Sequence, residues 1–174
     1  RDICSRLLAL GCVDQATAQT APGRVRLVNR AGAPAALAAA RLLFEAVPET
    51  LDAKREALEF VGRHAAPDAI VASSSSTMLA SELAGLLAHP QRFLNTHWLN
   101  PAYLIPLVEV SPHAGTSAAV LEDTLAALRA AGEVPVVCND KPGYIVPRLQ
   151  TLVMNEAARM IEEGTATAAD IDKA

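Results

Sequence analysis

The sequence predicts an α/β protein in which helices flank a mostly parallel sheet, followed by the start of an all-helical region. Two observations predict this fold class. Short apolar runs alternate with longer stretches of helical periodicity as far as Cys138, which is the pattern of repeated βαβ units. From Pro147 to Glu163 the apolar residues recur only at helical spacing, which indicates one long amphipathic helix.

Composition limits the classes of protein to which the chain can belong. Its 174 residues, 51% of them hydrophobic, are enough for one sizeable core. A net charge of −4 and an aromatic content of 3% argue against a nucleic-acid partner. Cys4, Cys12 and Cys138 are odd in number and lack metal-ligand spacing, which fits a reducing compartment and no metal site. Because there is no apolar run of about 18 residues, we expect a soluble cytoplasmic protein without a membrane partner.

The first forty residues predict two helical segments separated by a short strand. Residues 1–22 show helical spacing of leucine and isoleucine, with a break at Gly11. Arg24–Asn29 is a short β-type run, and Ala33–Ala40 is an alanine-rich helix. Pro34 suits the first turn of that helix.

The central part of the chain predicts two strands that alternate with two helices. The first strand is a continuous apolar run apart from Glu45, as expected of a strand buried on both faces. Thr77 is well placed to cap the second helix. The expected ranges are strands at Leu42–Val47 and Ala69–Ala72, and helices at Asp52–His64 and Met78–Leu87.

The last part of the chain predicts a change from alternating strands and helices to helices alone. A helix at Ser117–Ala131 and a strand at Val134–Cys138 end the alternating pattern. The helix at Pro147–Glu163 follows, and Thr167 begins another helix with Asp170 at its capping-box position. We therefore expect one domain over residues 1–140 and the start of a second, helical domain over residues 141–174. A lone amphipathic helix leaves its apolar stripe bare, so another surface must cover it.

One histidine and one carboxylate stand in neighbouring β-type runs. Leu94–Leu99 reads as a short strand closed by the turn dipeptide Asn100-Pro101, and Leu107–Val110 as a second strand. A connection of about six residues is short enough to return the chain, so we expect His97 and Glu109 to lie side by side. A carboxylate that accepts from one imidazole nitrogen leaves the other nitrogen free to act as a base.

These motifs resemble a known family. His-x-x-Asn-Pro from His97, followed by Pro-Leu-Val-Glu-Val from Pro106, is similar to the L-3-hydroxyacyl-CoA dehydrogenases, including the bacterial 3-hydroxybutyryl-CoA dehydrogenases. Three further segments agree in order and spacing, namely Phe44–Glu49, Ser73–Ser76 and Asp140–Val146. The resemblance extends from about Arg41 to the end of the chain. It implies a Rossmann-like NAD-binding domain followed by a helical domain for substrate binding and homodimer formation.

The glycine-rich turn of such a domain does not occur in this sequence. A dinucleotide fold opens with a strand, a Gly-x-Gly-x-x-Gly turn and a helix, and none of the nine glycines forms this pattern. We therefore expect an internal fragment that contains an incomplete NAD-binding domain over residues 1–140.

The resemblance implies roles for individual residues. His97 would be the general base and Glu109 its orienting partner, and Ser76 and Asn100 would contact substrate and cofactor. The implied cofactor contacts are Glu49, Lys54, Ser76 and Asn100. Each has a structural alternative: His97 a structural histidine at a strand end, Glu109 an outward-facing edge residue, Ser76 and Asn100 polar turn residues, and Glu49 and Lys54 charges at a helix start.

Two positions depart from the family pattern. Ser74 and Pro147 both stand where the family usually has asparagine. Proline offers no amide and no N–H, so any substrate contact made there by the family is absent. This change concerns the acyl substrate more than hydride transfer.

The expected function is hydride transfer between NAD and C3 of a 3-hydroxyacyl-CoA. A close alternative is a dehydrogenase of a free 3-hydroxy acid, of the L-gulonate or carnitine type. A third hypothesis is a non-catalytic fragment that only packs against a partner.

Overall fold

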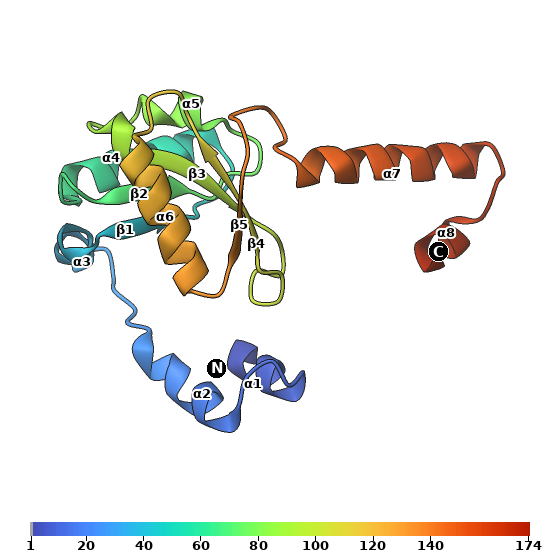
Figure 1. Ribbon diagram of the computed structural model, residues 1–174, viewed down its shortest axis with the longest axis horizontal. Helices are drawn as coiled ribbons and strands as arrows, with labels where there is room; N and C mark the ends of the chain where they lie inside the picture. Colours follow the sequence, from blue (N-terminus) through green and yellow to red (C-terminus); the bar gives the residue numbers. More distant parts are fainter. Residues whose placement is uncertain (1) are drawn as a thin grey trace.

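The computed structural model describes residues 2–174 and contains one sheet of five strands in the order β1-β2-β3-β4-β5. Neighbouring strands are parallel except for β3 and β4, which are antiparallel. The predicted Rossmann-like, mostly parallel sheet is therefore confirmed (Figure 1). The strands are β1 Leu42–Glu45, β2 Ile70–Ser73, β3 Phe93–Trp98, β4 Leu107–Pro112 and β5 Val134–Val137.

Helices cover both faces of the sheet and create two apolar clusters. Along β2, Ile70 and Ala72 belong to one cluster and Val71 belongs to the other, because successive strand residues point to opposite faces. The first cluster contains residues of α6 and the second contains residues of α4 and α5. The helices here are α3 Ala33–Ala39, α4 Leu51–His64, α5 Ala80–Ala84, η2 Pro90–Arg92 and α6 Ala118–Ala130.

Two helical segments lie outside this layered unit (Figure 1). The chain begins with α1 Asp2–Ala9, α2 Gln15–Thr20 and η1 Ala21–Arg24, and it ends with α7 Val146–Glu162 and α8 Ala168–Lys173. The predicted helical N-terminus is confirmed for its described residues, and Arg1 lies outside them. Gly164 follows the end of α7 with a φ of 73°. Thr167 caps α8 by accepting from the Asp170 amide, as predicted.

The strand predicted at Arg24–Asn29 is wrong. The structure has η1 as far as Arg24 and then an extended linker to α3 that belongs to no sheet. Leu27 in this linker is 94% exposed. An apolar β-type run forms a strand only where a neighbouring strand can pair with it, and the linker runs apart from the sheet (Figure 1).

Two further predictions need correction. The strand expected at Leu42–Val47 ends at Glu45 and lies at the edge of the sheet, and Phe44 is 46% exposed rather than buried. The helix expected at Met78–Leu87 is only α5, and Thr77 does not cap it. Instead, the Asp140 carboxylate accepts from the amides of Ala80 and Ser81 at 2.8 and 2.9 Å.

No helix in the described part of the chain has the length and apolar character needed to cross a membrane.

Candidate active site

His97 and Glu109 are opposite each other in the antiparallel pair β3–β4. Directly opposed residues of such a pair project from the same face of the sheet. His97 Nδ1 lies 2.8 Å from Glu109 Oε2, and both side chains are buried. The predicted contact between them is therefore present. With the carboxylate as acceptor, Nδ1 carries the hydrogen and Nε2 is left with a lone pair.

The second oxygen of Glu109 contacts the start of α7. Glu109 Oε1 accepts hydrogen bonds from the backbone amides of Ile145 and Val146, each at 2.8 Å. The first amides of a helix have no partner within it, and a carboxylate there also interacts favourably with the helix dipole. One buried carboxylate thus joins the imidazole of β3 to the first turn of α7.

Ser76 approaches the other ring nitrogen of His97. Its Oγ lies 3.1 Å from His97 Nε2, and Ser76 itself is exposed. Ser76 follows the carboxyl end of β2, which is the edge where ligands bind in open α/β sheets. The structure therefore brings together three of the predicted residues, with Nε2 on the accessible side of the site.

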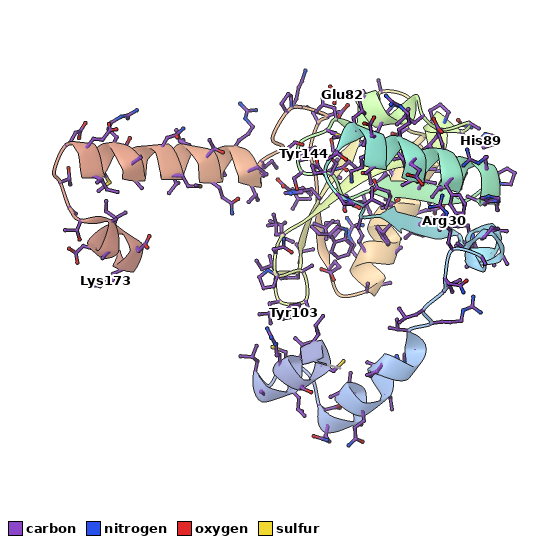
Figure 2. The ribbon with its side chains drawn as sticks, turned by 180° about the vertical axis from the view of Figure 1, so that it is seen from behind. Arg30, Glu82, His89, Tyr103, Tyr144 and Lys173 are labelled. Atoms are coloured by element: carbon purple, nitrogen blue, oxygen red, sulfur yellow. The ribbon has the colours of Figure 1, made fainter. Side chains whose placement is uncertain are left out.

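Tyr144 forms one wall of the site and was not expected from the sequence. Its ring stacks on the His97 ring with 5.4 Å between centroids and 29° between planes. Its hydroxyl donates to Met78 O and accepts from Asn95 Nδ2, each at 2.9 Å. Burial and then the nearby Asp140 carboxylate raise the pKa of Tyr144, so the hydroxyl remains protonated at neutral pH. Figure 2 shows Tyr144 where the chain leaves the sheet toward α7.

Asn95 is a second residue that sequence reasoning missed. It is fully buried in β3, and its side chain contacts the backbone of Ser75 through both amide atoms. A signal for it was present, because residues two apart on a strand point to the same face. An amide two positions before His97 in an apolar run therefore belonged to the histidine's face.

Glu49 organises the loop that carries Ser76. Its Oε1 accepts from the amides of Ser76 and Thr77 at 3.0 and 2.9 Å, and from the hydroxyls of Ser75 and Thr77. Burial alone would raise the pKa of Glu49, but these hydrogen bonds and the nearby Lys54 ammonium lower it to about 2. The carboxylate therefore stays ionised near neutral pH, with one third of its side chain exposed.

Lys54 lies behind Glu49 and is buried, with 1% of its side chain exposed. Its Nζ is 2.9 Å from Glu45 Oε1 and 3.6 Å from Glu49 Oε2. Glu45 also accepts from the Ser73 hydroxyl at 2.7 Å, so the glutamate that interrupts the apolar run of β1 is paired. Any influence of Lys54 on a ligand would pass through Glu49.

Asn100, another of the predicted site residues, follows the end of β3. It is exposed, two residues beyond β3, and within residues 2–174 its side chain makes no hydrogen bond. It precedes a cis peptide bond to Pro101 at the start of the loop between β3 and β4. Figure 2 shows Tyr103 at the tip of this loop.

The residues present fit the nicotinamide end of a dinucleotide. Such a ligand offers ribose hydroxyls that need acceptors. Among the described side chains, Glu49 Oε2 has the Lys54 ammonium as its one partner, at 3.6 Å. Glu49, Ser76 and Thr77 follow the carboxyl ends of the parallel strands β1 and β2, where nucleotides bind in this class of sheet. Among the described side chains, those of residues 3–174, no group of three or more histidine, cysteine, aspartate or glutamate residues could hold a metal ion.

Comparisons with known proteins identify the family to which the chain is related. Residues 1–141 match the family model for the 3-hydroxyacyl-CoA dehydrogenase NAD binding domain, and residues 143–174 match the model for the C-terminal domain. Lambda-crystallin from Oryctolagus cuniculus is 40% identical over 129 residues, which are 74% of this chain and 40% of that protein. The chain therefore spans about two fifths of the length of the curated relatives it matches.

Two solved structures share the fold over nearly the whole chain. A diketoreductase, described as acting on dicarbonyl compounds, has a TM-score of 0.88 and 30% identity, over 97% of this chain and 60% of that one. The (S)-3-hydroxybutyryl-CoA dehydrogenase from Ralstonia eutropha has a TM-score of 0.85 and 25% identity, over 95% of this chain and 58% of that one.

Proposed function

Because the chain belongs to the 3-hydroxyacyl-CoA dehydrogenase family, we propose that the whole protein is an NAD-dependent oxidoreductase of 3-hydroxyacyl substrates. In this proposal His97 is the general base and Glu109 orients it. The observation that carries it is the buried imidazole, which has a carboxylate 2.8 Å from Nδ1 and a hydroxyl 3.1 Å from Nε2.

His97 moves the proton of the reaction. In the oxidation direction, Nε2 accepts the proton of the C3 hydroxyl, and in reduction it returns that proton to the forming alcohol. Such a base typically accelerates a reaction by about 10²–10⁴-fold. Glu109 fixes the tautomer and stabilises the imidazolium that forms. NAD, when bound, supplies the hydride acceptor.

Three other residues have supporting roles in this mechanism: two contact the reactants and one covers the imidazole. The Ser76 hydroxyl is a donor to the substrate oxygen, next to Nε2 of His97. Glu49 offers its second carboxylate oxygen to the nicotinamide ribose. Tyr144 covers one face of the imidazole, and excluding water from that face strengthens the electrostatic interaction with Glu109.

The proposed substrate is a short 3-hydroxyacyl-CoA, as the name of the Ralstonia neighbour suggests. The alternative is a free 3-hydroxy acid or a related dicarbonyl compound, and one observation favours it. Pro147, in the first turn of α7, directly follows the two amides bound to Glu109. It offers neither an amide side chain nor an N–H to a thioester substrate.

An assay of the whole protein separates the two substrates. NADH oxidation is followed by absorbance with acetoacetyl-CoA and, in parallel, with acetoacetate. The proposal expects turnover with the thioester. Turnover with the free acid alone would mean that the substrate is a free 3-hydroxy acid and not a CoA thioester. The absence of NADH oxidation with any 3-keto substrate would refute the dehydrogenase assignment.

The proposed assembly is a homodimer in which a second subunit covers α7. This helix has no buried residue within the chain, and its exposed apolar side chains include Leu149, Leu152, Val153 and Met154. Sedimentation equilibrium of the whole protein tests this. A monomer at micromolar concentration would contradict it.

A further inference from the structure

The buried side-chain amide of Asn95 contacts both the segment that carries Ser76 and the tyrosine that stacks on His97. Asn95 lies two residues before His97 on β3 and is fully buried. Its Oδ1 accepts from the Ser75 amide at 3.1 Å, and its Nδ2 donates to the Ser75 carbonyl at 3.0 Å. Because one Ser75 group can only donate and the other can only accept, these contacts fix the orientation of the carboxamide.

These two hydrogen bonds replace the backbone pairing with a neighbouring strand that Ser75, beyond the end of β2, does not make. β2 ends at Ser73, where it pairs with Asn95 of β3, and Ser75 lies beyond that pairing. The chain then passes directly to Ser76, whose hydroxyl meets His97 Nε2. Holding the backbone of Ser75 therefore restricts where the next hydroxyl can lie.

The same amide also reaches the face of the imidazole. Its second N–H donates to the Tyr144 hydroxyl at 2.9 Å, and the Tyr144 ring stacks on His97. Tyr144 has a φ of 42°, a left-handed conformation that is uncommon for a residue with a side chain. The surrounding contacts therefore hold it there.

We propose that Asn95 is a positioning residue, whose carboxamide holds the Ser76 hydroxyl at Nε2 of His97 by fixing the backbone of Ser75. The proposal rests on the function proposed above for its kinetic consequence only. Asn95 itself does not touch the substrate. Its effect on the reaction passes through Ser76, and this distinguishes it from a residue that merely stabilises the fold.

A double-mutant cycle measures that dependence. kcat and KM of the whole protein are determined for the wild type, Asn95→Ala, Ser76→Ala and the double variant. We expect Asn95→Ala to lower kcat by roughly 10- to 100-fold, since small misplacements in an active site have effects of this size. We expect the double variant to lie within about threefold of Ser76→Ala, because coupled residues are not additive. Losses that multiply would overturn the proposal.

Two further variants separate positioning from folding. Thr124→Ala removes a side chain of α6 that is also fully buried and bonded to a backbone carbonyl, at 2.7 Å, and it should keep wild-type kcat. If Asn95→Ala does not fold, Asn95→Asp takes its place in the cycle. It keeps the acceptor for the Ser75 amide but loses the donor to the Ser75 carbonyl, so the same coupling to Ser76 is expected.

A readout independent of turnover keeps the proposal testable if the protein is not a dehydrogenase. Nitrogen-15 spectra of labelled histidine report each ring nitrogen of His97. Asn95→Ala should move the Nε2 resonance in the same direction as Ser76→Ala does, while Nδ1, which faces Glu109, stays near its wild-type position. An unchanged Nε2 resonance would overturn the proposal, whereas an inactive wild type would refute only the proposed function.

Discussion

The buried site in the sheet and the helix that follows it differ sharply. His97, Glu109 and Asn95 are buried, and each has hydrogen-bond partners. α7 begins only a few residues beyond Tyr144, yet it has no buried residue and exposes its apolar side chains. The two regions meet at one group, the Glu109 carboxylate, which binds the imidazole with one oxygen and the first amides of α7 with the other. The proposed proton-transfer site is therefore assembled within the sheet and the first turn of α7. No residue in the remainder of α7 is buried by another described part of the chain.

The largest expected effect is on turnover, and it concerns the buried site in the sheet. His97→Ala in the whole protein should lower kcat by about two or more orders of magnitude, because the base is lost. The affinity for NADH, measured by fluorescence titration, should change little. Equal losses in kcat and in NADH affinity would instead indicate a structural histidine.

The next effect tests the group shared by both regions. Glu109→Ala leaves the imidazole N–H and the amides of Ile145 and Val146 without their acceptor, so the free energy of unfolding should fall by about 2–4 kcal/mol. Denaturant unfolding of the chain measures this. Glu109→Gln, which can still accept from the amides, is the matched control and should lose far less stability. Its kcat should fall, because its side-chain NH2 then faces Nδ1 and favours the opposite tautomer of His97. The same small loss of stability in both variants would show that the carboxylate does not hold α7.

A smaller effect concerns the Glu49 loop and depends on pH. The pKa of Glu49 is lowered from 4.5 to about 2 in the folded protein, so the folded state favours the ionised form. This stabilisation is complete above about pH 4.5 and is lost as the pH falls toward 2. Glu49→Gln should therefore flatten the fall in Tm between these pH values. Glu59→Gln, an exposed glutamate of α4, should keep the wild-type slope, and equal slopes in all three proteins would contradict the lowered pKa.

The smallest expected effect concerns the exposed apolar side chains of α7. Leu152 is 66% exposed on α7, so Leu152→Ser should change the free energy of unfolding of the 174-residue chain by less than about 0.5 kcal/mol. In the whole protein the same change should weaken the proposed homodimer, as sedimentation equilibrium would show. A large loss of stability in the chain alone would mean that Leu152 is already covered.

The parts of the fold that local sequence determines were predicted correctly. The alternation of apolar runs and helical stretches located most strands and helices, and the short connection between β3 and β4 brought His97 beside Glu109. Both follow from short-range spacing, which can be read directly from a sequence.

The errors and omissions share a different cause. Arg24–Asn29 has strand propensity but no neighbouring strand, and the cap of α5 comes from Asp140, about 60 residues away along the chain. Tyr144 reaches His97 only because the chain folds back to the end of the sheet. These features depend on contacts between distant segments, which propensity and periodicity do not contain.

We propose that Glu109 acts on the reaction through His97. The most direct measurement is kcat for His97→Ala, Glu109→Gln and the double variant of the whole protein. We expect the double variant to turn over at the rate of His97→Ala, because removing the imidazole leaves the carboxylate nothing to orient. Losses of kcat that multiply in the double variant would contradict this role and show that Glu109 acts independently of His97.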